Sequence, residues 1–396
     1  MKIYHGSKKI VSMPICDQNN GNSDFGEGFY ATWSEELARE WAAADKNGGF
    51  LNIFEIDTED LKLLDLSNWS YDIRSWIALI LSNRMICLSS SSAEKADRII
   101  KDHLPDLDDA DIIIGYRADN INFSTVMAFI EDRITLEQLI KSIQNDDPGD
   151  QVLLRTPKAI SGLTYIETEN VEGLYYSKRL KKPCPGHLLC REFDLLGELT
   201  ACIEGSVPDL SVDRFLHMFT VSGYAGRFES GDPEVIYGLS GIELCRKVME
   251  ACGLYSTEFP SRLTLDREDP AYRSGYLLAS YLRERGLTFE DVISYIPFSR
   301  FRSLSEDPEE ESAKETFDII DKMLYERQPS ASRLQTRRKR LSLSQKELAA
   351  CSGVNIRTLQ QYETGAKDIN RAAADKVAAL SKALCCDTTQ LLEPVT

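Results

Sequence analysis

Short apolar runs alternate with helical hydrophobic patterns over residues 1–172, and this alternation predicts a domain of mixed structure. The runs have the length of strands and lie at 2–10, 50–56, 111–116, 151–155 and 163–167. We expect the last two runs to form a closing pair of strands. A helix is expected after Ser34, and the apolar stretch at 76–88 is typical of a core helix. The first part of the chain is therefore expected to be an α+β domain.

Helical periodicity dominates residues 185–328, and it predicts an all-helical domain. The candidate helices are separated by turns with Gly and Pro, and they cover residues 212–219, 241–252, 272–285 and 311–327. No spacing of residues in this part is typical of a catalytic site. A regulatory role, of the kind an antitoxin has, is the function we expect for it.

A polar linker with a proline, residues 328–332, separates the helical part from a third part, residues 333–396. This third part has the pattern of several short helices, and the last of them is expected over residues 372–384. The chain as a whole is therefore expected to hold three domains, one α+β and two all-α.

Local capping signals define two short helices within the third part. Ser344 and Glu347 form the reciprocal capping pattern that starts a helix. Gly353 permits a tight turn, Asn355 caps the second helix, and Gly365 ends it. Two short helices around a glycine turn form a helix-turn-helix unit.

The charge of the chain is unevenly distributed. The whole chain has 46 Lys and Arg against 63 Asp and Glu, a formal net charge of −17. Residues 333–396 alone have 11 Lys and Arg against 6 Asp and Glu, a net charge of +5, so the preceding residues carry −22. The acidic body argues against wholesale wrapping of nucleic acid or of an anionic membrane, and only the basic end is expected to contact DNA.

The ten cysteines lie at scattered positions without a CxxC pair, and the first residues lack the apolar stretch of a secretory signal. The apolar stretch at 76–88 is too short to cross a bilayer. We therefore expect a cytoplasmic protein with free thiols. Cys184, His187 and Cys190 offer three possible metal ligands, but zinc sites normally need a fourth ligand and another spacing, so no metal is expected.

A specific set of residues lies between positions 343 and 365. They are Gln345, Leu348-Ala349, Gly353-Val354, Thr358-Leu359 and Tyr362-Glu363-Thr364-Gly365. In these residues the segment closely resembles the phage-repressor-like, Xre-type helix-turn-helix family. The resemblance implies that the second helix enters the major groove of a DNA operator. The contacts it implies are base or phosphate contacts at Ile356, Arg357, Gln360 and Gln361, and a phosphate contact at Gln345.

Four consecutive cations at 337–340 lie just before this unit, where contacts with the DNA backbone are expected. A module kept only for oligomerisation or docking is the alternative. Repressor-like modules usually act as two-fold pairs on paired half-sites, so the resemblance also implies a homo-oligomer.

Two short motifs near the N-terminus indicate a ligand site. Tyr4-His5-Gly6-Ser7 lies at the start of the first strand, and Phe25-Gly26-Glu27-Gly28-Phe29-Tyr30 follows about twenty residues later. Glycines beside an acidic residue permit close approach of the backbone to a ligand. Alternation along a strand lets one of the two following rings pack inward while the other faces a pocket. A β-turn and core aromatic residues are the alternative.

Together and in this order, the motifs resemble those of ADP-ribosyltransferases of the diphtheria-toxin-like and poly-ADP-ribose-polymerase-like class. Residues 1 to about 170 resemble an uncharacterised bacterial domain family of that superfamily. The resemblance implies NAD as substrate in a split cleft, with His5 on the adenosine ribose, the main chain of Gly6 on the nicotinamide carboxamide, and Tyr30 stacked on the nicotinamide. The other NAD contacts that it implies are Tyr4, Ser7, Phe25, Gly26, Gly28 and Phe29.

The sequence departs from the superfamily at the third catalytic position, where Gln151 stands in place of the common Glu. A Gln oxygen still accepts a hydrogen bond from the nicotinamide ribose. However, it lacks the negative charge that stabilises the departing centre, worth about 4 kcal/mol at an effective dielectric near 20. Asp150, Glu167 or Glu169 are the alternatives for that carboxylate.

Three functions are compatible with these features. The first is a fused toxin–antitoxin-like protein, in which an ADP-ribosyltransferase acts on an unknown protein or nucleic-acid acceptor. In it, residues 185–328 restrain the NAD cleft or mediate oligomerisation. The second is a transcriptional regulator whose N-terminal domain senses NAD or is catalytically silent. The third is hydrolysis of NAD without a macromolecular acceptor.

Overall fold

The structure is a computed structural model, and it has two compact units, Met1–Tyr276 and Leu277–Thr396. It describes residues 1–15, 23–43, 47–68, 71–118, 121–146, 149–175, 190–254, 259–306, 313–327, 332–340, 343–384, 386, 388 and 391–393. The expected linker therefore lies outside the described residues except for Ser332. The chain is mixed α/β with a helical C-terminal region, as the hydrophobic pattern predicts.

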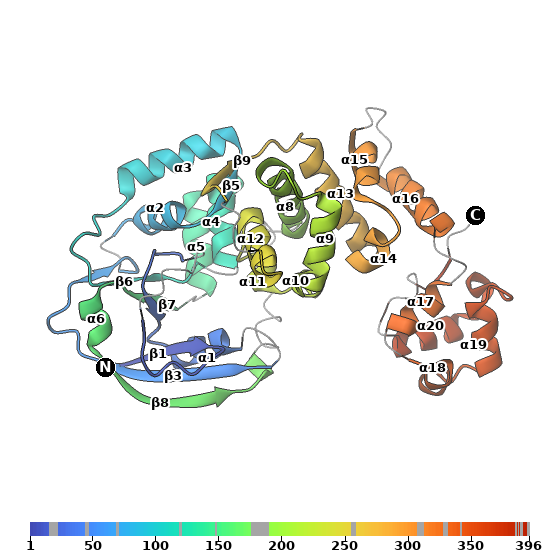
Figure 1. Ribbon diagram of the computed structural model, residues 1–396, viewed down its shortest axis with the longest axis horizontal. Helices are drawn as coiled ribbons and strands as arrows, with labels where there is room; N and C mark the ends of the chain where they lie inside the picture. The colour runs from blue at the N-terminus through green and yellow to red at the C-terminus, as the bar shows by residue number, and fades with distance from the viewer. Residues whose placement is uncertain are drawn as a thin grey trace. The chain divides into compact units, whose positions relative to one another are not determined.

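Two β-sheets organise the N-terminal part of the first unit (Figure 1). One sheet is antiparallel, with the strand order β1 (Lys2–Ser7), β3 (Gly49–Ile56), β8 (Leu163–Val171). The other has the order β2 (Phe29–Ala31), β7 (Asp150–Leu154), β6 (Ile112–Tyr116), β4 (Leu63–Asp65). The two sheets share one apolar cluster, to which the first contributes Ile3 and Phe54 and the second Phe29 and Ile112, and each sheet also contributes to a cluster of its own. The edge strands of the two sheets, β1 and β2, carry the two N-terminal motifs.

The expected closing pair of strands is wrong, because β7 and β8 belong to different sheets. β7 lies between β2 and β6, with its residues 151–154 buried. β8 is an edge strand whose residues are mostly exposed. The short helix α6 (Pro157–Ser161) carries the chain from one sheet to the other. Alternation of apolar and polar residues identifies a strand but not the strand it pairs with. The sequence pattern therefore does not tell whether β7 and β8 pair with each other or belong to different sheets.

The expected core helix over 76–88 is also only partly right. Helix α2 (Ile73–Asn83) is buried as expected, but it ends before Arg84, whose backbone is extended at φ −89° and ψ 148°. Residues 86–88 form strand β5 (Ile86–Leu88), which is buried and therefore has the same apolar composition as the helix. Four further helices complete the N-terminal part: α1 (Glu35–Ala42), α3 (Ser90–His103), α4 (Ile121–Ile130) and α5 (Leu136–Asp146).

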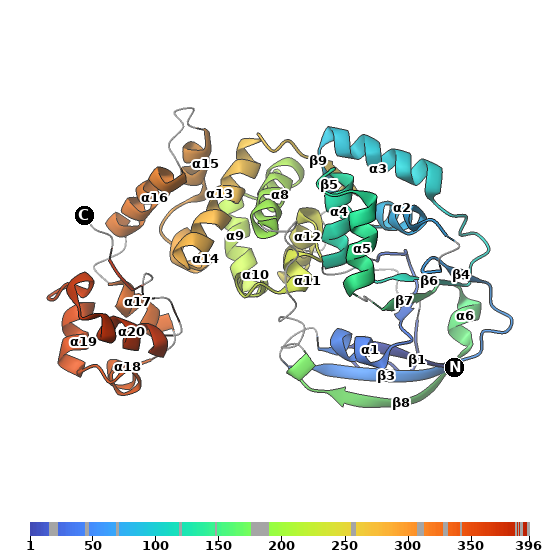
Figure 2. The same ribbon diagram turned by 180° about the vertical axis from the view of Figure 1, so that it is seen from behind.

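A helical segment, residues 190–276, completes the first unit. Its helices are α8 (Arg191–Ser206), α9 (Val212–Val221), α10 (Tyr224–Glu229), α11 (Pro233–Ile236), α12 (Gly241–Ala251) and the start of α13 (Pro270–Arg285). It also holds strand β9 (Arg262–Thr264), which pairs in parallel with β5 and lies beside it in both views (Figures 1 and 2). The expected all-helical character of this part is therefore wrong at one strand. That strand joins the helical segment to the N-terminal part by backbone hydrogen bonds.

The second unit is helical throughout its described residues. After α13 it contains α14 (Phe289–Ile293), α15 (Phe298–Glu306), α16 (Ala313–Arg327), α17 (Arg333–Arg340), α18 (Gln345–Ser352), α19 (Ile356–Glu363), a 3₁₀ turn (Ile369–Arg371) and α20 (Ala374–Ala383). Residues of α17 to α20 share one apolar core. No helix among the described residues has both the length and the apolar composition that a membrane span requires.

Candidate functional site

The edges of the two sheets meet at the first N-terminal motif. The N–H of Tyr4 donates to the carbonyl of Thr32, and the N–H of Thr32 donates to the carbonyl of Tyr4, both at 2.9 Å. Hydrogen-bonding direction alternates along a strand, so the N–H and C=O of Gly6 point to the same side as those of Tyr4, away from β3. Gly6 therefore presents a main-chain donor and acceptor toward the side of β2.

The His5 ring is fixed by the main chain of the second motif. Its Nδ1 lies 2.7 Å from the carbonyl oxygen of Tyr30. A carbonyl only accepts, so Nδ1 carries the proton and Nε2 is left as an acceptor. Burial lowers the pKa of His5, against the opposite effect of this hydrogen bond, and favours the neutral ring. The ring also packs on Phe29 with a centroid distance of 4.6 Å. His5 therefore offers one oriented, neutral acceptor.

The Tyr30 hydroxyl is tied to the residues that precede its strand. It donates to the carbonyl of Gly26 at 2.7 Å and accepts from the N–H of Phe25 at 3.1 Å. Burial, and to a lesser extent the charge of Asp24, raises the pKa of Tyr30 far above its ordinary value. The phenol is therefore neutral. Its ring packs against the apolar cluster that contains Phe25 and Trp76.

The His5 and Tyr30 rings do not face each other. His5 packs on Phe29, which belongs to the cluster of Ile3 and Phe54, whereas Tyr30 packs on the cluster across the sheet. What joins the two motifs is the bond from the His5 ring to the main chain of Tyr30. Contacts with opposite ends of one dinucleotide remain a prediction.

Gln151 lies on the same face of its sheet as Tyr30, since Tyr30 is opposite Leu153 on β7. Only 6% of Gln151 is exposed, and its partner on β6 is Gly115. A Cβ on Gly115 would lie 2.8 Å from the Phe25 ring, so that ring covers the strand directly beside Gln151.

The three carboxylates named as alternatives to the Glu of the superfamily differ in their surroundings. Glu169 is paired at 2.5 Å with Arg39 of α1, which also binds Glu35. Glu167 is exposed on the outer strand β8, in the other sheet from Gln151. Asp150 is adjacent to Gln151 in β7 and half-buried. Since successive side chains of a strand point to opposite faces, Asp150 lies on the face of β7 opposite to Gln151 and Tyr30.

The remaining residues of the two motifs shape the backbone. The Ser7 hydroxyl donates to the carbonyl of Lys9 at 2.6 Å, as a turn residue does. Gly28 has a φ of +152°, and a Cβ there would lie 2.5 Å from the carbonyl oxygen of Leu154. Only glycine fits this position, because β7 approaches it closely.

Sequence reasoning missed Asn52, which holds the first motif from behind. It is fully buried on the central strand β3. Its Nδ2 donates to the His5 carbonyl at 3.2 Å and to the Ser7 hydroxyl at 3.0 Å. Its Oδ1 accepts from the Val11 N–H at 2.9 Å and from the Thr168 hydroxyl at 3.0 Å. The one available signal was a lone amide within the apolar run at 50–56.

The C-terminal unit contains the expected helix-turn-helix. Ser344 and Glu347 make both hydrogen bonds of the capping box that starts α18. Gly353 ends α18 with a φ of +68°, and the Asn355 side chain accepts from the N–H of Arg357 to start α19. These local predictions are confirmed.

The expected DNA contacts lie on and beside α19. Arg357, Gln360 and Gln361 are exposed, and Ile356 is half-buried. Gln345 is half-buried too: its amide nitrogen donates to Glu363 at 2.8 Å and its oxygen accepts from Gln360 at 3.2 Å. Gln345 and Gln360 therefore lie side by side, the first at the N-terminus of α18 and the second on the exposed face of α19.

The four consecutive cations do not form a single exposed cluster. Arg338 is buried and makes two hydrogen bonds to Glu363, at 2.6 and 2.9 Å, and Arg337 donates to the carbonyl of Gly286 at 2.9 Å. Lys339 is exposed, and the side chain of Arg340 lies outside the described residues. Arg338 is therefore bound inside the domain, where Glu363 compensates its charge, and does not face outward as a contact for DNA.

No group of three or more His, Cys, Asp or Glu side chains in the described ranges is arranged to hold a metal ion. Cys184 and His187 lie outside those ranges. The third member of that motif, Cys190, has a free thiol.

Two family models match the chain. Residues 334–391 match the family described as helix-turn-helix, and residues 1–165 match one described as a protein of unknown function, DUF3990. No curated protein and no solved structure matches. The first match confirms the helix-turn-helix and supports DNA binding through the C-terminal domain. The second assigns no activity, so the use of NAD stays a prediction.

Proposed function

We propose that this is a DNA-binding regulator fused to an NAD-using domain, in the manner of a joined toxin and antitoxin. The N-terminal domain transfers ADP-ribose from NAD to a protein or nucleic-acid acceptor, and the helix-turn-helix domain binds an operator. The observation that carries the first half is the bond between the His5 ring and the Tyr30 main chain, beside the main chain of Gly6, whose N–H and C=O point away from β3.

The groups at this edge complement the two ends of NAD. A carboxamide has one donor group and one acceptor, and the main chain of Gly6 offers the matching acceptor and donor. The Nε2 of His5 is an acceptor for a ribose hydroxyl, because Nδ1 is occupied by Tyr30. Both sets of contacts come from rigid strands, which is where precise binding sites are best supported.

The proposed reaction breaks the bond between ribose C1′ and the nicotinamide nitrogen. Nicotinamide leaves with the electron pair, and a nucleophile of the acceptor bonds to C1′ and loses its proton. Positive charge develops on the ribose in between, and a nearby carboxylate would stabilise it. Gln151 only accepts a hydrogen bond from the ribose and carries no charge, so we expect slow turnover.

A second function is favoured by the same position. Gln151 carries no charge and Glu169 is already paired with Arg39, so the N-terminal domain is equally suited to bind NAD without consuming it. In that case the protein is a regulator that senses NAD.

Labelled NAD separates these functions in the full chain. Transfer of label or release of nicotinamide supports the enzyme, and we expect His5→Ala to weaken binding or turnover about tenfold through one lost hydrogen bond. The matched control is His217→Ala, at an exposed histidine of α9. Binding without turnover supports the sensor. If wild type neither binds nor consumes NAD, both proposals for this domain fail.

For the second half of the proposal, DNA sequences bound by the full chain are first selected from a random pool. Gln360→Ala is then expected to weaken binding to the selected sequence about tenfold, the value of a good contact with a base edge, and to leave non-specific binding unchanged. Fluorescence anisotropy measures both. The control is Lys382→Ala, at an exposed cation near the end of α20. It should reduce the sequence preference and the affinity for the selected sequence less than Gln360→Ala does. Equal losses on every sequence would assign Gln360 to the phosphate backbone instead.

We also propose that two copies of the chain bind together. Helix-turn-helix proteins commonly read paired half-sites about one helical turn apart, with one α19-type helix in each. The selected sequences test this directly, since a dimer would select an inverted repeat.

A further inference from the structure

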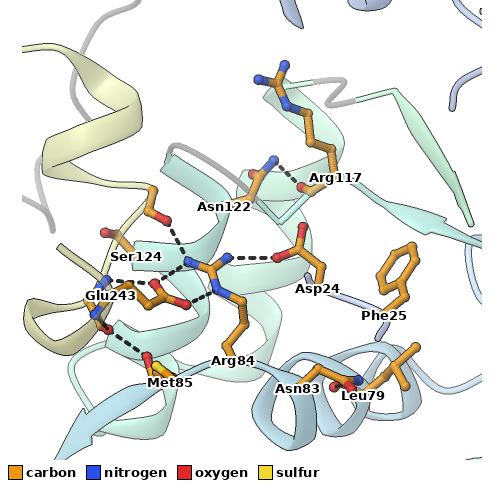
Figure 3. A network of polar contacts seen from close by, with 12 residues as sticks. Asp24, Phe25, Leu79, Asn83, Arg84, Met85, Arg117, Asn122, Ser124 and Glu243 are labelled. Carbon is orange, nitrogen blue, oxygen red and sulfur yellow. Dashed lines mark hydrogen bonds and ion pairs between the residues drawn. The ribbon is translucent and has the colours of Figure 1, made fainter. Parts of the chain in front are cut away.

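A buried guanidinium links the helical segment to the N-terminal part (Figure 3). Arg84 follows α2, and only 3% of it is exposed. Its Nη1 donates to Asp24 at 2.7 Å and its Nη2 donates to Glu243 of α12 at 2.6 Å, while its Nε donates to the other oxygen of Glu243. Nη2 also donates to the carbonyl of Gly238 at 2.6 Å, and the guanidinium lies over the Phe123 ring, 4.0 Å from its centroid.

Contacts other than those with Arg84 also hold the Glu243 side chain in place. It is fully buried and is the third residue of α12, where its Oε2 accepts from the N–H of Ser240 at 3.0 Å. The Ser240 hydroxyl in turn donates to the carbonyl of Met85, next to Arg84, at 2.5 Å. Because Glu243 receives two parallel hydrogen bonds from Arg84, it fixes the plane of the guanidinium and the direction of Nη1.

Asp24, at the other end of the guanidinium, starts the segment that holds Tyr30. Asp24 is 4% exposed, so its carboxylate depends on Arg84 for charge compensation. The next residue, Phe25, gives its N–H to the Tyr30 hydroxyl, and Gly26 accepts from the same hydroxyl. The Phe25 ring also covers β6 beside Gln151. One continuous set of contacts thus runs from α12 to two residues of the candidate site.

We propose that Glu243 is a positioning residue for the N-terminal site, which rests on the proposed use of NAD there. Through Arg84 and Asp24, it keeps the 24–28 segment against Tyr30 and Gln151. The helical segment is then a structural part of the site, because it supplies Glu243, the carboxylate that orients Arg84. Removal of this segment is expected to loosen the site. If the segment only restrained a complete site, its removal would instead activate the site.

Hydrogen exchange of the full chain tests this coupling without any ligand. Glu243→Gln keeps the shape of the side chain but replaces one of the two acceptor oxygens by an NH₂ group. We expect peptides covering residues 24–31, which include the Phe25 amide, to lose protection about tenfold or more. The matched control is Glu250→Gln, on the same helix, where the carboxylate is 41% exposed and 3.6 Å from Arg246. Asp24→Asn, at the other end of the set, should reproduce the loss.

Protection of β3 in the same samples serves as the internal reference. A selective loss at 24–31 in Glu243→Gln and Asp24→Asn, with Glu250→Gln unchanged, supports the proposal. Unchanged or increased protection at 24–31 overturns it, since Glu243 would then have no role in holding this segment. An equal loss at β3 also overturns it, since Glu243 would then contribute only to the stability of the whole unit.

NAD titration of the same proteins connects the coupling to function. We expect Glu243→Gln to raise the Kd for NAD about tenfold and Glu250→Gln to leave it unchanged. If wild type does not bind NAD, the proposed function fails, but the exchange comparison still decides whether Glu243 positions the segment. If wild type binds NAD and Glu243→Gln binds it equally well, the positioning role is overturned.

Discussion

Replacing Arg84 with methionine is expected to lower the free energy of unfolding of the first unit by about 3–5 kcal/mol, the usual effect of removing one partner of a buried ion pair. Methionine fills much of the volume, so the main effect is electrostatic. Asp24 and Glu243 would then be two buried carboxylates without their cation. Urea denaturation followed by tryptophan fluorescence measures this loss, because all four tryptophans lie within the first 76 residues and report on this unit alone.

Two comparisons make the Arg84 result specific. Arg262→Met removes a more exposed arginine, whose partner Asp97 is 67% exposed, and should cost under about 1 kcal/mol. Combining Arg84→Met with Asp24→Asn and Glu243→Gln removes the charges together and should recover much of the stability. A loss below 1 kcal/mol for Arg84→Met alone would mean that water or a rearrangement compensates both carboxylates, contrary to their burial.

Gly6→Ala is expected to destabilise the same unit by about 3 kcal/mol, the upper range for overpacking a filled interior. A Cβ at Gly6 would lie 1.9 Å from the carbonyl oxygen of Ala38 and 2.6 Å from the amide nitrogen of Ala42. Both are backbone atoms of α1, so no side-chain rotation relieves the overlap, and α1 must move away from β1. The same fluorescence-monitored denaturation measures the effect.

Gly205→Ala is the matched control, because it makes the same chemical change within α8, where a Cβ meets no atom within 4 Å. It should be neutral or stabilise by up to about 1 kcal/mol through helix propensity. An equally mild effect of Gly6→Ala would show that α1 and β1 are not in the close contact described here. It would also remove the reason why glycine is required in the first motif.

The structure also changes how the helical segment can be separated from the N-terminal part. A fragment of residues 1–172 would lack the partner of β5 and the carboxylate that fixes Arg84. Its failure to poison bacteria would therefore not argue against a toxic activity, because the fragment is expected to be poorly folded. A fragment that retains the helices up to the end of α13 is the better comparison with the full chain.

Prediction from the sequence succeeded where structure depends on neighbours in the chain. The capping box at Ser344, the turn at Gly353 and the cap at Asn355 each involve residues within three positions of one another. Hydrogen bonds over so short a distance form for the same residues in most surroundings. The helix-turn-helix was therefore visible before any tertiary contact was known, and so was the strand character of the first motif.

The candidate N-terminal site was only partly visible in the same way. The motifs identified His5, Gly6 and Tyr30, but not that the His5 and Tyr30 rings pack in different apolar clusters. Asn52 looked like one more residue of an apolar strand, although it holds the first motif through hydrogen bonds to residues more than 40 positions away. A lone amide in an apolar run is the only local signal, and it does not tell which residues the side chain binds.

By itself, then, the sequence determined the elements whose stabilising contacts lie within a turn or two of chain: the capped helices, the glycine turns and the apolar strands. Only the tertiary structure decided which strands pair, why α2 stops at Asn83, and which carboxylates compensate Arg84. The last of these depends on Asp24 and Glu243, which lie 60 and 159 positions from Arg84 in the sequence. A buried charge requires a partner of opposite charge, and the fold can bring that partner from any position in the sequence. The spacing of residues along the chain therefore does not predict which residue the partner is.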